Sequence, residues 1–235
     1  EQPYKYNGKE FERKNGLNWM DYGARHYDAA LGRFTTIDPL TEKYYGWSPY
    51  AYCMNNPVRF VDSDGRKVYF APGVSAQFKQ DFAKSVQYLN SRGAGGMLAK
   101  LEKSDKVYYI AESSEAGSKY NTENKTITWA SKHGLLTNEG IMLSATSVLN
   151  HEVDHALQHD QNPEQQKADG KRNLTNPYTN KEEERVITGS EQETAKKLGE
   201  IKDGEVTRKD HGGTLYEMKS STSTEIKDEI IITPK

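Results

Sequence analysis

Aromatic residues are concentrated near the start of this 235-residue chain, and their distribution predicts two structural units. Residues 1–66 contain 13 Phe, Trp and Tyr residues, whereas the rest of the chain, more than twice as long, contains 11. Such a change in composition marks regions that fold differently. We therefore expect one domain over residues 1–66 and a second over residues 67–235. The Ser/Thr-rich and then charged tail after about residue 219 is expected to be frayed or to form a single edge strand.

Composition narrows the classes of protein that the chain can belong to. No run approaches eighteen apolar residues, so no membrane span is expected. The net charge of −2 gives no clustered basic face for nucleic acid, so nucleic acid is not expected as a partner. Cys53 is the single cysteine, which excludes an internal disulfide and a cysteine cage, so any metal must be held by His and carboxylates. The first residues carry neither an initiator Met nor an apolar signal segment, and we expect a piece of a longer protein.

The first unit combines aromatic residues with turn residues at close spacing. Its most regular segments are Trp19 to Asp28, Gly32 to Pro39 and Asn55 to Asp62, which are rich in Tyr, Gly, Asn-Pro and Asp-Pro. Gly, Pro, Asn and Asp favour tight turns, whereas aromatic residues favour strands. The pattern predicts short aromatic strands separated by tight turns.

These segments resemble the core at the C-terminal end of Rhs-repeat proteins, just before their variable toxin tips. The resemblance covers about residues 4–66. It implies a β-shell wound around a toxin, and a pair of aspartates that cuts the tip free, for which Asp38 and Asp62 are the candidates. Ser63 follows Asp62 where the family usually has Pro, which argues against self-cleavage. The alternative is that both aspartates simply cap turns.

The second unit has the pattern of an α+β domain. Apolar residues at helical spacing predict helices over residues 74–92 and about 140–159. Residues 107–111 and 126–130 read as strands, and the turn-rich segment between them predicts a hairpin. Helices together with a small sheet make an α+β domain.

The predicted helix over 140–159 carries the motif His151-Glu152-Val153-Asp154-His155. Residues four apart on a helix share one face, so both imidazoles can bind the same metal ion. This is the arrangement of the H-E-x-x-H zincins, in which the glutamate, here Glu152, acts as a general base for the metal-activated water. The alternative is a solvated or hydrogen-bonded histidine pair. Asp154 occupies a position that zincins usually fill with an uncharged residue.

A catalytic zinc needs a third protein ligand and an open fourth position. Downstream candidates are His159, His211 and the carboxylates. The extended spacing H-E-x-x-H-x-x-G-x-x-H is absent, because Gln158 and Gln161 stand at its Gly and His positions. We therefore expect a glutamate as the third ligand.

Residues 180–189 predict a short helix with Asn180 as its N-cap and Gly189 as its terminator. Of its three glutamates, Glu183 shares the inward face with both apolar residues of the helix. We expect Glu183 to be the third ligand, with Glu184 as the reserve. The alternative is a solvated acidic helix start, which the helix dipole favours.

The run His-Glu-x-x-His-Ala-Leu, then Glu-Glu-x-Arg-Val-Ile-Thr-Gly, then a late Arg and His, is similar to the NleD-like effector metallopeptidases over about residues 145–216. The resemblance implies a small zincin-like metallopeptidase domain with an active-site helix, Zn²⁺, a glutamate ligand, and proteolysis of a protein inside a target cell. Arg208 and His211 then become candidates to stabilise an oxyanion, and Tyr216 a weaker one. A solvated loop is the alternative for these residues.

Together these patterns predict a zinc-dependent endopeptidase that forms the toxin tip of an Rhs-type protein. Its expected partners are a protein substrate in a target cell, an immunity protein and the remainder of the Rhs shell. We expect it to be secreted, or delivered into a neighbouring cell, as part of a larger protein. The rival class is a non-catalytic binding or adhesion module on an Rhs-type core. A nuclease tip is disfavoured by the acidic balance and by the lack of a second His/Asn constellation.

Overall fold

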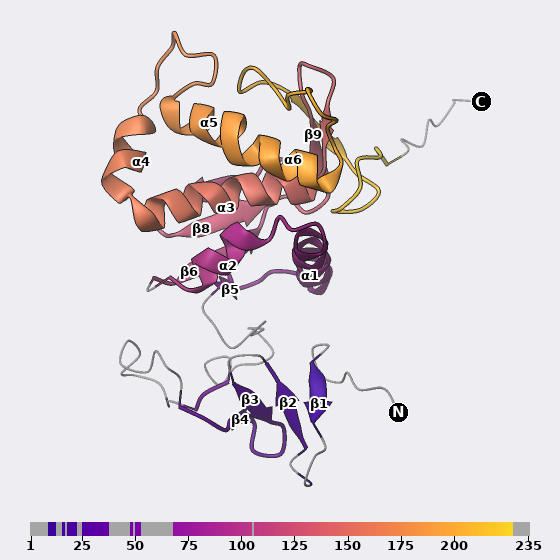
Figure 1. Ribbon diagram of the computed structural model, residues 1–235. Helices are drawn as coiled ribbons and strands as arrows, with labels where there is room; N and C mark the ends of the chain where they lie inside the picture. The colour runs from indigo at the N-terminus through magenta and orange to yellow at the C-terminus, as the bar shows by residue number, and fades with distance from the viewer. Residues whose placement is uncertain are drawn as a thin grey trace, which may run out of the picture. The chain divides into compact units, whose positions relative to one another are not determined.

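The computed structural model describes residues 9–12, 16, 18–22, 25–37, 48, 50–52, 68–104 and 106–227 (Figure 1). The chain divides into two compact units, Glu1–Gly73 and Val74–Lys235. Asp38, Asp62 and Cys53 lie outside the described residues, as does the end of the tail after residue 227. The self-cleavage hypothesis and the boundary near residue 66 therefore stay predictions.

The first unit contains a meander of four described strands. They are β1 (Glu10–Glu12), β2 (Trp19–Asp21), β3 (His26–Asp28) and β4 (Arg33–Phe34), which pair antiparallel in this order. The Asp28 carboxylate accepts hydrogen bonds from the backbone N–H groups of Ala30 and Leu31 and so closes the turn between β3 and β4. The short strands expected from the sequence, and the tight turn between β3 and β4, are confirmed among the described residues, whereas Asn55 to Asp62 lies outside them. A further strand, β5 (Val68–Phe70), lies just before the division.

Aromatic side chains form the core of the first unit. The buried set is Met20, Tyr22, Tyr27, Phe34 and Tyr52. The rings meet mostly edge to face, and the two buried hydroxyls of Tyr22 and Tyr52 lie 2.9 Å apart in a hydrogen bond. Aromatic packing of this kind supplies much buried area from few residues.

One sheet of the second unit corrects the predicted hairpin. Its strands include β6 (Tyr108–Glu112), β7 (Lys119–Asn121) and β8 (Thr126–Trp129). Strand β8 lies between the other two, parallel to β6 and antiparallel to β7. The hairpin expected between residues 107–111 and 126–130 is wrong, because β7 forms between them. The Asn121 side chain accepts hydrogen bonds from the N–H groups of Glu123 and Asn124, which builds the tight turn that makes β7 the hairpin partner of β8.

A second small sheet lies farther along the chain. It is formed by β9 (His133–Leu136), β10 (Met142–Leu143) and β11 (Thr214–Glu217), with β9 in the centre and antiparallel to both neighbours. Strand β11 thus brings the chain after residue 213 back beside β9, shortly before the helix that begins at Ala145. This return positions the loop that precedes β11 near that helix.

The two long helices among the first four of the second unit begin at serine caps. The first four are α1 (Ala76–Ser91), α2 (Gly96–Glu102), α3 (Ala145–Gln161) and α4 (Pro163–Asp169). Ser75 caps α1 and Ser144 caps α3, each through a side-chain oxygen that accepts a backbone N–H three residues on. The two long helices expected from periodicity are confirmed, with α3 starting a few residues after the expected position.

A continuous helical segment follows α4. It comprises α5 (Lys181–Val186), the π-helical turn η5 (Ile187–Glu191) and α6 (Gln192–Leu198). Asn180 is the N-cap as expected, because its side chain accepts the N–H of Glu183 at 2.8 Å. The expectation that Gly189 ends the helix is wrong: Gly189 lies inside the π turn, and the segment ends at Gly199, whose φ of 79° is the left-handed conformation that glycine tolerates.

Helix α3 is the centre of the second unit. It packs against α2, against strands β7, β8 and β9, and against the α5–η5–α6 segment, which runs along it in Figure 1. Its residues Ala145, Leu149, Val153 and Ala156 are fully buried. The buried Trp129 indole N–H donates to the carbonyl of Ala145 at 2.7 Å and so ties the start of α3 to β8. The architecture is mixed α+β with small sheets.

None of the helices within the described residues has the length and apolar character that crossing a membrane requires.

Truncating the core of α3 should destabilise the second unit. Leu149 is 0% exposed, so we expect Leu149→Ala to lower the free energy of unfolding by about 2–5 kcal/mol, the usual effect of a buried leucine cavity. The control is Leu174→Ala, since that side chain is 86% exposed and should contribute little. Urea unfolding followed by the helical circular dichroism signal measures both. Equal effects of the two substitutions would contradict this packing.

Candidate metal centre

Helix α3 brings His151 and His155 together at one point. They are one turn apart, both nearly fully buried, and their Nε2 atoms lie 3.1 Å from one another. The two imidazole rings are close to perpendicular, at 76°, so they do not stack and their Nε2 atoms converge. The predicted histidine pair therefore shares one site.

Glu183, at the start of α5, completes this site from the opposite helix. Its Oε2 lies 3.3 Å from His151 Nε2, and its Oε1 lies 3.4 Å from His155 Nε2. Glu184 points elsewhere, because its carboxylate accepts a hydrogen bond from Asn176. His151, His155 and Glu183 each offer one donor atom, all within 4.8 Å of one another, and could hold a metal ion.

The other ring nitrogen of each histidine also meets a carboxylate. His151 Nδ1 lies 2.8 Å from Glu191 Oε2, and His155 Nδ1 lies 3.0 Å from Glu182 Oε1. A carboxylate accepts a hydrogen bond but cannot donate one, so each Nδ1 carries the proton. Each Nε2 is then left with a lone pair, unless the ring takes up a second proton.

Three acceptors therefore face one another at the centre of the site. They are the two Nε2 lone pairs and the carboxylate of Glu183. The buried Oε2 of Glu183 accepts no well-formed hydrogen bond from the described residues, although imidazole nitrogens lie 3.3 Å away. Buried acceptors need a partner. Protonation of both imidazoles, or one metal cation, satisfies all three, and this chemistry fits the donor set.

The electrostatics of the cluster match this requirement. Burial lowers the pKa of His155, but the carboxylates of Glu182 and Glu183 outweigh it and raise that pKa to about 10. Burial acts on His151 in the same way, and Glu183 with Glu191 raises its pKa. Burial raises the pKa of Glu183, but the surrounding histidines hold it well below its usual range. The centre thus attracts positive charge strongly.

Two arginines neutralise the outer carboxylates. Arg208 donates from Nε and Nη2 to Glu191 at 3.0 and 2.6 Å, and Arg185 donates from Nε and Nη2 to Glu182 at 3.0 and 2.8 Å. Arg185 also reaches both oxygens of Asp154, which Ser190 contacts as well. The charged residue inside the motif is thereby explained, because it anchors Arg185.

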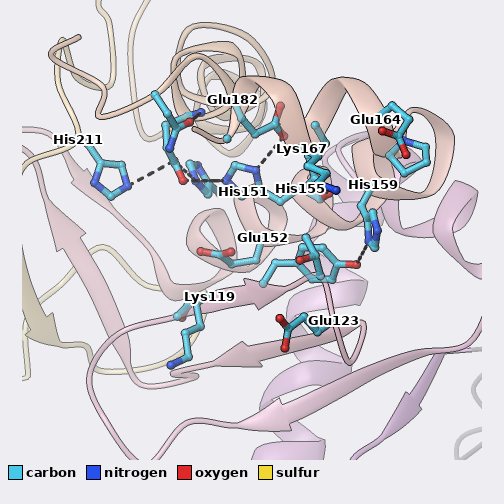
Figure 2. Close-up of a pocket in the computed structure, with 18 residues that line it drawn as sticks. Lys119, Glu123, His151, Glu152, His155, His159, Glu164, Lys167, Glu182 and His211 are labelled. Atoms are coloured by element: carbon cyan, nitrogen blue, oxygen red, sulfur yellow. Dashed lines mark hydrogen bonds and ion pairs between the residues drawn. The ribbon is translucent and has the colours of Figure 1, made fainter. Parts of the chain in front are cut away.

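A cavity of about 800 Å³ opens beside the three donors. Figure 2 shows Glu152 inside it, between His151 and Lys119 of strand β7. Glu152 comes from the same helix as the histidines but does not belong to the group of converging donors. Tyr120 and His159 line the same cavity and are hydrogen-bonded to one another at 2.6 Å.

The three residues that the sequence suggested for stabilising an oxyanion lie in different environments. His211 lines the cavity with its Nε2 3.3 Å from Glu183 Oε2, and its backbone N–H is held by the carbonyl of Pro177. Arg208 is buried and engaged by Glu191. Tyr216 is half-buried on β11, opposite Gly134. The structure therefore brings His211 to the site directly and Arg208 through Glu191.

Sequence reasoning missed Glu182 and Glu191. Glu182 adjoins Glu183, and a search for partners of both ring nitrogens could have found it. Glu191 has no local signal, because its position depends on the π turn, which nothing in Ile187–Glu191 announces.

The second unit is therefore an α+β domain with a His-His-Glu cluster that could hold a metal ion and that lies beside a cavity. No family model matches the chain, and no solved structure matches it. The chain is similar to the salivary gland surface protein 1 of Aedes aegypti, with 44% identity over 63 residues. That match covers 27% of this chain and 2% of that protein, so the chain spans a small part of the relative's length.

The raised histidine pKa values predict how the stability of the metal-free protein depends on pH. His155 has a pKa of about 10 in the folded state and about 6.5 when unfolded. Between these values the folded state holds a proton that the unfolded state has lost, so stability falls as pH rises from about 6.5 to 10. His155→Gln should flatten that decline. Urea unfolding of chelator-treated protein at several pH values measures it, and stability that rises over this range would contradict the cluster's electrostatics.

Proposed function

We propose that the second unit is a zinc-dependent endopeptidase with a zincin-like arrangement. The observation that carries the proposal is the convergence of His151 Nε2, His155 Nε2 and the Glu183 carboxylate beside a cavity that also contains Glu152. Two helical histidines, a glutamate from a second helix and an adjacent non-ligand glutamate form the H-E-x-x-H donor set.

Zinc suits these donors better than calcium or magnesium does. Zinc accepts both imidazole nitrogen and carboxylate oxygen, whereas calcium and magnesium prefer oxygen alone. Ligand distances of about 2.0–2.1 Å in a tetrahedral zinc site put neighbouring donors about 3.3 Å apart. The two Nε2 atoms lie 3.1 Å apart, and each has a different oxygen of Glu183 at 3.3 or 3.4 Å, which supports a site of this size. When bound, zinc would activate a water and polarise the substrate carbonyl.

The residues of the chain itself would then act in defined ways. Glu152 takes the proton from the attacking water and delivers it to the leaving amine, so no covalent intermediate is needed. His211 lines the same cavity from the loop before β11, and its ring would stabilise developing negative charge on the substrate. The cavity is large enough for several residues of a peptide.

We further propose that this unit is the C-terminal toxin tip of an Rhs-type protein. The support is the turn and aromatic pattern of residues 4–66, which resembles an Rhs core. The tip would be secreted or delivered into a neighbouring cell, would cleave a protein there, and would be restrained in its producer by an immunity protein. The remainder of the Rhs shell would be its carrier.

The second candidate function is a non-catalytic adhesion module. The partial match to a protein that is named for a surface favours it. In that case the histidine cluster would hold a structural cation or protons, and Glu152 would have no proton to transfer. Metal content and hydrolysis together separate the two functions.

Purified protein should carry close to one zinc per chain, because three protein ligands make one site. His151→Ala should lose it, since two ligands hold zinc poorly. His159→Ala is the matched control, because His159 lines the same cavity but lies outside the donor group. Elemental analysis after removal of loosely bound metal measures the content. Full zinc occupancy in His151→Ala would rule out the assigned site.

Glu152→Gln should separate hydrolysis from metal binding. The substitution keeps volume but removes the basic oxygen, so zinc and fold survive while cleavage falls by about 10²-fold or more. Labelling of the new protein N-termini produced in a cell lysate measures cleavage without knowledge of the substrate. Glu164→Gln, at the rim of the same cavity, is the control and should remain active. Unchanged cleavage by Glu152→Gln would refute the mechanism, and a zinc-loaded wild type that creates no new N-termini would favour the adhesion module.

A further inference from the structure

We infer that two arginine–glutamate–histidine chains position the metal ligands, and that the one ending at His151 is the stronger. The Arg208 relay is Arg208, Glu191 and His151, and the Arg185 relay is Arg185, Glu182 and His155. The inference rests on the proposed function insofar as the site binds zinc. It assigns Arg208 a positioning role in place of contact with the substrate.

The Arg208 relay is buried along its whole length. The side chains of Arg208, Glu191 and His151 are 6%, 2% and 7% exposed. Arg208 grips both oxygens of Glu191, and Thr207 adds a third hydrogen bond to the same carboxylate at 2.8 Å. A hydrogen-bond donor occupies every acceptor position of the Glu191 carboxylate. Arg208 and Thr207 therefore fix the orientation of this carboxylate toward His151 Nδ1.

The Arg185 relay is built alike but is more open. Its arginine side chain is 36% exposed, and it divides its donors between Glu182 and Asp154. Solvent competes for an exposed guanidinium, so its hold on Glu182 is weaker than that of Arg208 on Glu191. The two relays therefore differ in strength although their chemistry is the same.

Both relays act on the same property of the imidazole ring. A carboxylate at Nδ1 fixes the proton there and leaves the Nε2 lone pair for a metal. Both Nε2 atoms face Glu183 in this state. A relay that sets the ring's tautomer and orientation thus sets the geometry of the metal centre without touching the metal.

The π turn explains how a single helical segment supplies the third ligand and both outer carboxylates. Eight residues of regular helix at about 100° each would rotate Glu191 about 80° away from the direction of Glu183. A π turn contains one more residue than a regular helical turn. With it, the side-chain directions of Glu183 and Glu191 differ by only about 20°. Glu191 then faces α3 together with Glu183. The unusual turn is consequently part of the metal centre.

An alternative role for Arg208 is direct stabilisation of an oxyanion. Its Nε and Nη2 are both engaged by Glu191, and the side chain is 6% exposed. A substrate that recruited these two donors would have to displace Glu191 from its buried position. The geometry therefore favours action through Glu191.

The test compares Glu191→Gln, Glu182→Gln and Arg208→Lys in the full chain. Zn²⁺ affinity is measured by competition with a chromogenic chelator, and Co²⁺ is substituted so that its visible absorption reports ligand geometry. We expect Glu191→Gln to weaken Zn²⁺ binding by about 10–100-fold and to change the Co²⁺ spectrum. Glu182→Gln should weaken binding less. Arg208→Lys keeps the positive charge but loses the bidentate hydrogen bonds to Glu191. Its Zn²⁺ affinity should therefore lie between those of the wild type and Glu191→Gln.

The matched control is Glu200→Gln. Glu200 binds Ser144 and Ser147 at the start of α3, but it does not contact either histidine. Its substitution should lower thermal stability and leave Zn²⁺ affinity and the Co²⁺ spectrum unchanged. If Glu191→Gln behaves like Glu200→Gln, the Arg208 relay is purely structural and the inference is overturned.

The outcomes also separate this inference from the proposed peptidase. Zinc binding that depends on Glu191 without any proteolysis would overturn the peptidase and uphold the relay. Proteolysis with Zn²⁺ affinity unchanged in Glu191→Gln would overturn the relay and uphold the peptidase. A wild-type chain that fails to bind Zn²⁺ would overturn both.

Discussion

The second unit depends on one electrostatic constraint, the burial of several acids at a single helix–helix contact. The carboxylates are Asp154, Glu182, Glu183 and Glu191, and the guanidiniums are Arg185 and Arg208. Four negative and two positive charges leave a net −2 when both imidazoles are neutral. Buried charge of this size is costly unless it is compensated. Two protonated histidines or one divalent cation compensates it, so the packing of α3 on α5–η5–α6 and the occupancy of the site are energetically coupled.

Features that depend on local spacing could be predicted from the sequence. The helical period places His151, Glu152 and His155 on α3, and Asn180 caps α5 because its side chain reaches a nearby backbone N–H. Glu183 could be chosen over Glu184 because the inward face of a short helix follows from its apolar residues. In each case the information lies within a few residues of the feature.

Features that depend on distant parts of the chain could not. The parallel pairing of β6 with β8 is set by the intervening β7, whose three residues carry little strand signal. The continuation of the helix past Gly189 is stabilised by packing on α3, which overrides the usual effect of glycine. Glu191 meets His151, and Arg208 meets Glu191, only after that continuation, so no spacing in the sequence identifies these contacts.

The confinement of the centre to two helices has a consequence for protein engineering. Apart from His211, the described groups that contact the three donors come from α3 or from the α5–η5–α6 segment, which lie against one another. The pair amounts to a portable module: a scaffold that presents two such helices at the same crossing could accept the whole donor set without the surrounding sheets. A designer would have to keep the one inserted residue of the π turn in the second helix. This residue makes Glu183 and Glu191 point the same way, whereas a regular α-helix would turn them apart.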